Sequence, residues 1–302
     1  MNSLLRPCIF LLVFFSCTSN PEDMVVIGSK MDTEGTIMGY IQLLALEDAG
    51  ISVEDRIETG PTLIVRQALL SGEIDGYIEY TGTALVNFMK MAKPDILTSP
   101  GKSYRTIAEW DSIKNHIIWL KPWSGINNTY TVLMQRNRAK SQNVHSISDM
   151  RQWVNNGGKL LFASDHEFSG RPDGLEGLLK IYSLHANPDF QVINMDAGLV
   201  YQTLKQGSVD AAIGYSTDGR IAAFDLVRLK DDKEYFPVYN PTPIYREETL
   251  KRFPEIERIL NQIASVITAE DITEMNYRHD VNLERAKFLA EEWLNRNKII
   301  NK

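Results

Sequence analysis

The sequence contains little cysteine: its two cysteines, Cys8 and Cys17, both lie within the first 17 of 302 residues. The rest of the chain therefore has neither a disulfide framework nor a zinc site built on cysteine. Basic residues are not in excess, since the formal net charge is −7, whereas proteins that bind nucleic acid usually carry a basic face. Beyond the N-terminus, no apolar run reaches the roughly eighteen residues of a spanning helix, which excludes a permease.

Signatures of catalysis are missing as well. The five histidines are scattered without the spacing of metal ligands, and no glycine-rich phosphate loop is present. Ser164, Asp165 and His166 are triad residue types, but three consecutive residues cannot form a nucleophile–base–orienter chain with one another. We therefore expect no catalytic residue, no metal and no cofactor. The 43% of hydrophobic residues suffices for one large or two medium globular domains.

Residues 1–16 have the pattern of a secretory signal. Arg6 precedes an apolar run, from Cys8 to Phe15, that is too short to span a bilayer. Ser16-Cys17 resembles the lipobox of bacterial lipoproteins, which implies cleavage before Cys17 and a lipid on that residue. Residues 17–23 would then be a polar tether. A plain signal peptide, or a buried N-terminal strand with an incidental cysteine, is the alternative. The lipoprotein interpretation predicts an extracytoplasmic protein of the cell envelope, anchored to a membrane by its N-terminal lipid.

The remaining chain alternates between strand and helix patterns. Strands are predicted at about 24–28, 53–58, 74–78, 159–164 and 190–194, and helices at about 33–50, 62–71, 174–184 and after 246. The order β-α-β-α-β occurs twice. It predicts an α/β fold with mostly parallel sheets and helices on both faces.

An internal repeat supports two related lobes. A shift of 135 positions places one set of residues on another: Val65, Gln67, Leu69, Gly72, Asp75, Ile78 and Tyr80 fall on Val200, Gln202, Leu204, Gly207, Asp210, Ile213 and Tyr215. Each copy has a helix, a glycine stop and a strand ending in tyrosine, a pattern that convergence of two α/β units would also give. Ligands collect at the carboxyl ends of strands in such sheets, so Tyr80 and Tyr215 are expected to face each other across a cleft. Asp75 and Asp210 are predicted to be turn or hydrogen-bonding residues.

Six motifs occur in order along the chain: Ile27-Gly28-Ser29-Lys30, Gly72-Glu73-Ile74-Asp75, Glu79-Tyr80-Thr81-Gly82-Thr83, Asn127-Asn128-Thr129-Tyr130, Arg171-Pro172-Asp173-Gly174 and Tyr215-Ser216-Thr217-Asp218-Gly219-Arg220. Over about residues 24–300 the chain resembles the substrate-binding proteins of ABC importers for glycine betaine, choline and related quaternary ammonium osmoprotectants. The resemblance implies the two-lobed type II periplasmic-binding-protein fold, with the ligand in the interlobe cleft. Lobe 1 would comprise residues 24–127 and 238–302, and lobe 2 residues 128–237. Crossings near 125–128 and 235–240 would form the hinge.

The resemblance also implies a set of ligand-binding residues. A trimethylammonium group has no N–H and is held by aromatic faces, and the matching cage positions are Tyr80, Tyr130, Tyr215 and Tyr239. The carboxylate of a betaine needs cationic or hydroxyl donors, for which the matching positions are Lys30, Thr83 and Arg171. Glu167 would orient Arg171 or lie near the cationic head.

The resemblance therefore predicts a monomeric solute binder, with no enzymatic activity, whose partners are an ABC permease and ATPase. Its ligand would be a small quaternary ammonium compound, glycine betaine first, with proline betaine, carnitine, choline and ergothioneine as competitors. The alternative is a sensory protein that signals through a receptor. Two departures from the family pattern bear on ligand choice: Met31-Asp32 replaces the usual asparagine and phenylalanine, and Leu63 occupies a turn position that is often polar.

Overall fold

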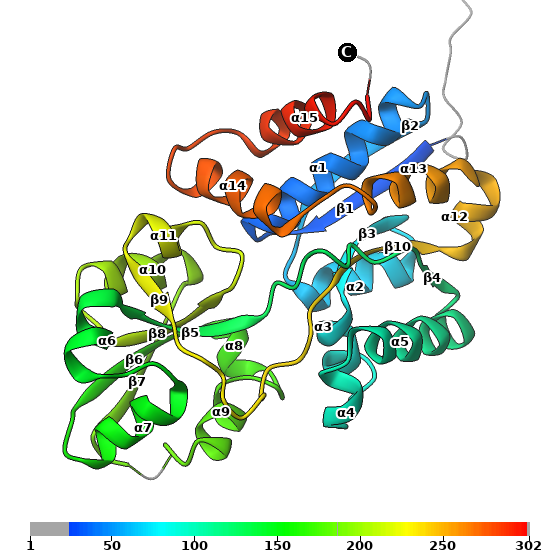
Figure 1. The fold of residues 1–302 in the computed structure, drawn as a ribbon. Helices are drawn as coiled ribbons and strands as arrows, with labels where there is room; N and C mark the ends of the chain where they lie inside the picture. The colour runs from blue at the N-terminus through cyan, green and yellow to red at the C-terminus, as the bar shows by residue number, and fades with distance from the viewer. Residues whose placement is uncertain (1–23, 186, 301–302) are drawn as a thin grey trace, which may run out of the picture.

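The structure, a computed structural model, describes residues 24–185 and 187–300. It contains two five-stranded sheets with flanking helices, and the chain passes between them twice (Figure 1). We call the first sheet with its helices lobe 1 and the second sheet with its helices lobe 2. The predicted signal peptide (1–16), the tether (17–23) and the lipidated Cys17 lie outside the described residues.

Lobe 1 is built from both ends of the described chain. Its strands are β1 (Met24–Lys30), β2 (Ser52–Gly60), β3 (Gly76–Tyr80), β4 (Ile117–Trp119) and β10 (Pro241–Arg246). Its helices are α1 (Thr33–Asp48), α2 (Thr62–Ser71), α3 (Thr81–Asn87), α4 (Pro94–Leu97), α5 (Pro100–Asn115), α12 (Glu247–Arg252), α13 (Glu255–Ile263), α14 (Ala269–Asp280) and α15 (Ala286–Arg296). Side chains alternate along each strand, so Ile78 packs with α1 and α13–α15 while Tyr77 packs with α2, α3 and α5.

Lobe 2 lies between these two parts in sequence. Its strands are β5 (Tyr130–Gln135), β6 (Leu160–Asp165), β7 (Phe190–Met195), β8 (Ala211–Tyr215) and β9 (Leu226–Arg228). Its helices are α6 (Arg136–Gln142), α7 (Ile147–Asn155), α8 (His166–Gly170), α9 (Leu175–Ile181), α10 (Ala197–Lys205) and α11 (Arg220–Ala223). In neither lobe does a described helix have the length and apolar character needed to cross a membrane.

The two sheets have the same arrangement of strands. Their orders are β2-β1-β3-β10-β4 and β7-β6-β8-β5-β9. In each sheet one strand, β10 or β5, runs antiparallel to both of its neighbours, and the others are parallel to one another. The prediction of an α/β fold with mostly parallel sheets is confirmed. The antiparallel strand was not foreseen, because it enters from the opposite lobe and not through a helical crossover within its own sheet.

The internal repeat corresponds to equivalent elements of the two sheets. The shift of 135 positions places α2 on α10 and β3 on β8, and both helices are followed by a glycine with a left-handed backbone, Gly72 at φ 83° and Gly207 at φ 74°. Asp75 accepts a hydrogen bond from the backbone of β1 at 2.8 Å, and Asp210 accepts one from the backbone of β6 at 2.6 Å. The predicted hydrogen-bonding role of both aspartates is confirmed, and each fastens the start of one strand to its neighbour.

Two connections, residues 120–129 and 229–240, join the lobes. They are hydrogen-bonded to each other: the Asn128 N–H donates to the Tyr239 carbonyl at 3.1 Å, and the Asn240 side chain donates to the Ile126 carbonyl at 2.6 Å. The predicted hinge segments, 125–128 and 235–240, lie within these connections, as do the predicted lobe limits. That the lobes move about this point stays a prediction.

Candidate ligand-binding site

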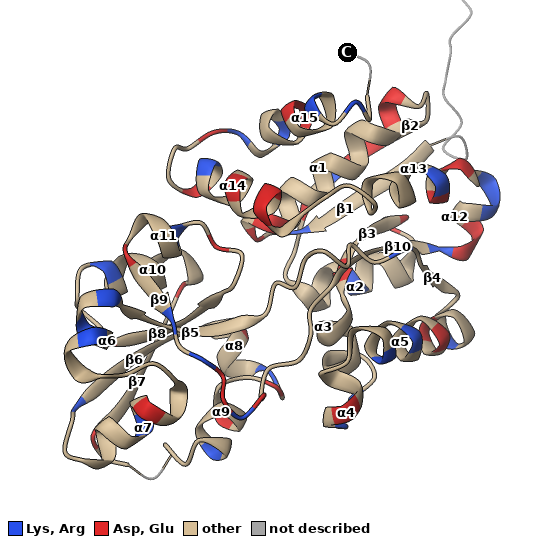
Figure 2. Cartoon of the chain, viewed as in Figure 1, with Lys and Arg blue, Asp and Glu red and all other residues tan. Residues whose placement is uncertain are grey.

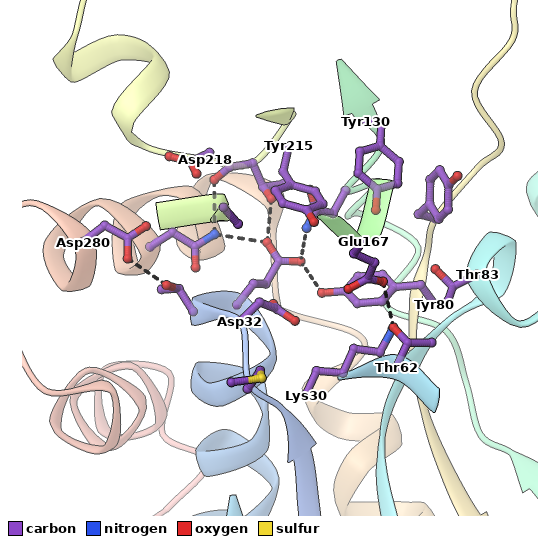
Figure 3. Close-up of a pocket in the computed structure, with 18 of the residues that line it drawn as sticks. Lys30, Asp32, Thr62, Tyr80, Thr83, Tyr130, Glu167, Tyr215, Asp218 and Asp280 are labelled. Atoms are coloured by element: carbon purple, nitrogen blue, oxygen red, sulfur yellow. Dashed lines mark hydrogen bonds between the residues drawn. The ribbon is translucent and has the colours of Figure 1, made fainter. Parts of the chain in front are cut away.

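A cavity of about 310 Å³ lies between the lobes. All eight side chains predicted to bind the ligand line it, and Figure 3 shows six of them around the same space; the eight are Lys30, Tyr80, Thr83, Tyr130, Glu167, Arg171, Tyr215 and Tyr239. Both lobes and the second connection contribute to its wall. The structure thus brings the predicted residues together, and their contact with a ligand stays a prediction.

Strand ends place these side chains at one edge of each sheet. Lys30 ends β1, Tyr80 ends β3 and Tyr215 ends β8. Tyr130 begins β5, and because β5 runs antiparallel to β8, this first residue pairs in register with Tyr215. The carboxyl ends of the parallel strands in both sheets therefore face the cavity, as the α/β pattern predicts.

The tyrosines from lobe 2 and the second connection form one aromatic group. The ring centroid of Tyr130 lies 5.0 Å from that of Tyr215 and 5.7 Å from that of Tyr239, with the second pair nearly perpendicular at 88°. Tyr80 is on lobe 1 (Figure 3). Burial raises the pKa of all four phenols above their usual value of 10.0, so they remain neutral in ordinary buffers. Neutral phenol rings of this kind attract cations through their π faces.

Arg171, between α8 and α9, is held by Asp173. Its Nε and Nη2 donate to the two oxygens of Asp173 at 2.8 Å and 2.7 Å. Asp173 also accepts from the hydroxyl of Tyr239 at 2.5 Å. One buried carboxylate thus orients both an arginine and an aromatic ring of the cavity wall, and sequence reasoning did not single it out.

The remaining guanidinium nitrogen of Arg171 reaches lobe 1. Nη1 lies 3.5 Å from the hydroxyl of Thr83 and 3.6 Å from Oε1 of Glu167. Glu167 in turn accepts a hydrogen bond from the Thr62 hydroxyl, in the first turn of α2, at 3.0 Å. Glu167 therefore lies beside Arg171, as one of its two predicted roles requires, and both residues touch the opposite lobe.

Lys30 already has a partner within the protein. Its Nζ is 2.6 Å from Oε1 of Glu79 and 4.9 Å from the ring centroid of Tyr80, and both members of the ion pair are buried. An ammonium group has three donors, so Glu79 leaves donors of Lys30 for a ligand carboxylate. The predicted clamp role of Lys30 stays a prediction.

Sequence reasoning missed Glu34, whose carboxylate lies in the cavity wall at the first turn of α1. Only 4% of Glu34 is exposed. It accepts hydrogen bonds from Tyr80 Oη at 2.7 Å, Asn128 Nδ2 at 3.0 Å, Thr217 Oγ1 at 2.5 Å and Asn276 Nδ2 at 3.1 Å. Tyr80 and Asn276 belong to lobe 1, on strand β3 and helix α14, whereas Asn128 lies in the first connection and Thr217 in lobe 2. No local sequence pattern predicts these four hydrogen bonds, because their donors come together only when the chain has folded.

The other charged residues of the wall have polar partners within the protein. Arg220 on lobe 2 lies 2.6 Å from Asp218 and 3.3 Å from Asp280 of lobe 1. Asp32 caps α1 by accepting from the Gly35 N–H at 2.8 Å. Among the described residues, no group of histidine, cysteine, aspartate and glutamate could hold a metal ion.

Glu34 should give stability a distinctive pH dependence. Burial raises its pKa above the usual 4.5, although its hydrogen bonds act in the opposite direction. Between the pKa of Glu34 in the unfolded chain and its higher pKa in the folded protein, the folded protein binds more protons than the unfolded chain. The stability that protonated Glu34 contributes is therefore complete below the unfolded pKa and is lost as the pH rises through the folded pKa. We expect Glu34→Gln to lack that loss. The free energy of unfolding, measured in denaturant from about pH 4 to 8 as wild type minus variant, should fall as pH rises, by about 1.4 kcal/mol per unit between the two pKa values. A flat difference would contradict this.

Comparison with known proteins connects this geometry to a family. Residues 23–296 match the family described as the substrate binding domain of ABC-type glycine betaine transport system. The chain is 33% identical to a glycine-betaine-binding protein of Pseudomonas aeruginosa over 308 residues, which is 100% of this chain and 97% of the relative. It is 32% identical to the carnitine transport binding protein OpuCC of Listeria monocytogenes, over 91% of this chain and 87% of that protein. A crystal structure of a glycine betaine/carnitine/choline ABC transporter superimposes with a TM-score of 0.76 at 29% identity, covering 92% of this chain and all (100%) of that one.

Proposed function

Because the chain belongs to the family of substrate-binding domains of ABC-type glycine betaine transport systems, we propose that it captures a small quaternary ammonium compound, glycine betaine first, for an ABC importer. One observation carries the proposal. A single interlobe cavity brings four tyrosine side chains together with Arg171, Thr83 and Lys30. Proteins of this family bind and deliver solutes and are not enzymes.

The tyrosines suit the cationic end of such a ligand. A quaternary ammonium group cannot donate a hydrogen bond, and each aromatic face contributes roughly 0.5–2 kcal/mol of attraction when it is desolvated. Tyr130, Tyr215 and Tyr239 supply such faces on one side of the cavity and Tyr80 on the other. Together they provide aromatic faces for the methyl groups of a trimethylammonium group, which a primary amine lacks.

Arg171, Thr83 and Lys30 suit the anionic end. Nη1 of Arg171 and the hydroxyl of Thr83 lie 3.5 Å apart across the cleft, so one carboxylate can accept from both. Asp173 and Glu79 hold the two cationic side chains in place before a ligand arrives. This arrangement favours a betaine over choline, which has no carboxylate.

Titration calorimetry tests the proposal. The panel comprises glycine betaine, proline betaine, carnitine, choline and ergothioneine, with dimethylglycine as the control that lacks one methyl group. We expect glycine betaine to bind and dimethylglycine to bind at least about ten-fold more weakly. Choline binding more tightly than every betaine would overturn the carboxylate assignment. Failure of all quaternary compounds to bind would overturn the proposed ligand class.

The cellular setting follows from the same family. Substrate-binding proteins of ABC importers act outside the cytoplasm. We propose that this one is a monomer, anchored by a lipid on Cys17, that delivers its ligand to a permease and its ATPase. Mass spectrometry of protein extracted from membranes should show an acylated Cys17 at the N-terminus, and an intact Met1 would contradict the anchor.

Ligand binding should close the cleft. Lobe 2 already contacts lobe 1 through Thr217 with Glu34 and through Arg220 with Asp280. A ligand that touches both lobes stabilises the closed arrangement by its differential affinity for that state. We expect small-angle scattering to show a smaller radius of gyration with saturating glycine betaine than without it. An unchanged radius, with binding confirmed calorimetrically on the same sample, would contradict closure.

A further inference from the structure

Glu34 is a buried carboxylate of the cavity wall with no cation beside it. On the outer helices acidic and basic residues lie together, as on α12 in Figure 2, where Glu247 is 2.6 Å from Lys251. Within the cavity wall, Asp218 and Asp280 share Arg220. Across the described parts of the chain, no lysine, arginine or histidine lies within ion-pair distance of Glu34.

A buried carboxylate without a cation is costly to the folded protein. Taking a charge out of water carries a penalty that hydrogen bonds from neutral groups offset only in part. The four donors to Glu34 are two amides and two hydroxyls. They leave the negative charge itself uncompensated, and the space next to it is the cavity.

Glu34 and Arg171 lie in different parts of that cavity. Glu34 bonds with Thr217 and Asn276, next to Asp218 and Asp280. Arg171 faces Thr83, and its neighbour Glu167 bonds with Thr62. In Figure 3, Asp218 and Asp280 lie on one side of the cavity and Thr62 and Thr83 on the other. Glu34 and Arg171 have no hydrogen-bond partner in common.

We propose that Glu34 is the counter-charge for the cationic head group of the ligand, opposite the carboxylate clamp at Arg171. The inference rests on the proposed function and adds to it a residue and an orientation. The head group lies next to Glu34, and the carboxylate points to Arg171 and Thr83. Cζ of Arg171 lies 5.3 Å and 5.7 Å from the ring centroids of Tyr130 and Tyr239, so these two rings flank the clamp end. The reverse orientation places carboxylate against carboxylate. Glu34 therefore also discriminates against anions that have the shape of a betaine without its positive charge.

The competing role for Glu34 is a purely structural one. Its bond to Thr217 joins the lobes, so a substitution could weaken every ligand simply by hindering closure. A pair of ligands that differ only in the charge of the head group separates the two roles. Glycine betaine and 3,3-dimethylbutanoate are such a pair, because a carbon atom replaces the quaternary nitrogen while the shape and the carboxylate are kept.

Calorimetry, with competition titrations for weak binding, compares both ligands in wild type and in Glu34→Gln. We expect the variant to bind glycine betaine at least about ten-fold more weakly and 3,3-dimethylbutanoate as tightly as wild type or more tightly. Asp280→Asn is the matched control, since this cavity carboxylate has Arg220 as its partner, and it should leave the ratio of the two dissociation constants within about three-fold of wild type. If the preference for glycine betaine over 3,3-dimethylbutanoate falls as far in Asp280→Asn as in Glu34→Gln, the effect comes from the total negative charge of the cavity. That result would overturn the specific role of Glu34.

Weakening of both ligands by the same factor in Glu34→Gln would show that Glu34 is structural. If that variant does not fold, Glu34→Asp keeps the charge and decides the matter: retention of the wild-type ratio within about three-fold supports the proposal, and its loss overturns it. The failure of the proposed function looks different, because wild type itself would then bind no quaternary ammonium compound.

Discussion

Replacing Arg171 by alanine should weaken glycine betaine binding by roughly thirty-fold to several thousand-fold, because truncating one partner of a desolvated ion pair typically costs roughly 2–5 kcal/mol. Choline has no carboxylate, so it should lose much less. The structure adds a secondary effect. Asp173, which is only 8% exposed, would lose its bidentate partner, and its bond to the Tyr239 hydroxyl would be disturbed. We therefore expect choline to lose up to about ten-fold through the displaced ring.

Calorimetry with both ligands measures this difference. Asp173→Asn is the matched control, because it keeps Arg171 but removes the charge that holds it. It should weaken choline about as much as Arg171→Ala does, through the disturbed Tyr239 ring, and weaken glycine betaine less than Arg171→Ala does, because the guanidinium is still present. Equal losses of the two ligands in Arg171→Ala itself would show that this arginine orients Asp173 and does not bind the carboxylate.

Replacing Tyr130 by alanine should weaken every quaternary ligand by about a hundred-fold, since several cation–π contacts depend on this ring. Its neighbours Tyr215 and Tyr239 would lose the surface on which they pack. Phe168, whose ring centroid lies 4.7 Å from that of Tyr130, would lose it too. Truncation of a buried aromatic side chain also costs roughly 3–5 kcal/mol of stability. Unlike Arg171→Ala, this variant should weaken choline strongly as well as betaine.

Tyr130→Phe is the control, because it keeps the ring and removes only the hydroxyl. We expect calorimetry to place its dissociation constants within about three-fold of wild type. Thermal unfolding of both variants measures how much of the weaker binding by Tyr130→Ala is due to a smaller fraction of folded protein. Folded Tyr130→Ala protein that binds choline as tightly as wild type would remove this ring from the cage.

The parts of the site that were predictable are those fixed by local pattern. Tyr80 and Tyr215 end strands that follow a helix and a glycine stop, so the α/β pattern alone placed them at the carboxyl edges of two sheets. The order of β5 within its sheet was not predictable in this way. The position of β5 depends on how the chain enters lobe 2 from lobe 1, and the sequence pattern of residues 130–135 does not predict that path.

The residues that were missed are those defined by tertiary contact. Glu34 and Asn276 are 242 positions apart and meet only because α14 packs against the start of α1. The partner of Arg171 had a weak local signal, since Asp173 follows it by two residues in Arg171-Pro172-Asp173-Gly174. Arg171 lies in a binding motif, but because it is buried it is paired with Asp173 before any ligand binds.

The repeat has a consequence for the direction in which a ligand can bind. A cavity made of two equal halves would hold a dipolar molecule in two opposite orientations with the same free energy. The shift places Tyr80 on Tyr215, but Tyr130 and Tyr239 have no counterpart tyrosine in the cavity wall, and Lys30 falls on Asp165 and Glu34 on Ser169. The two orientations therefore differ in free energy because the two halves differ both in aromatic rings and in charge. The direction in which a dipolar ligand binds is thus set by the differences between the two halves.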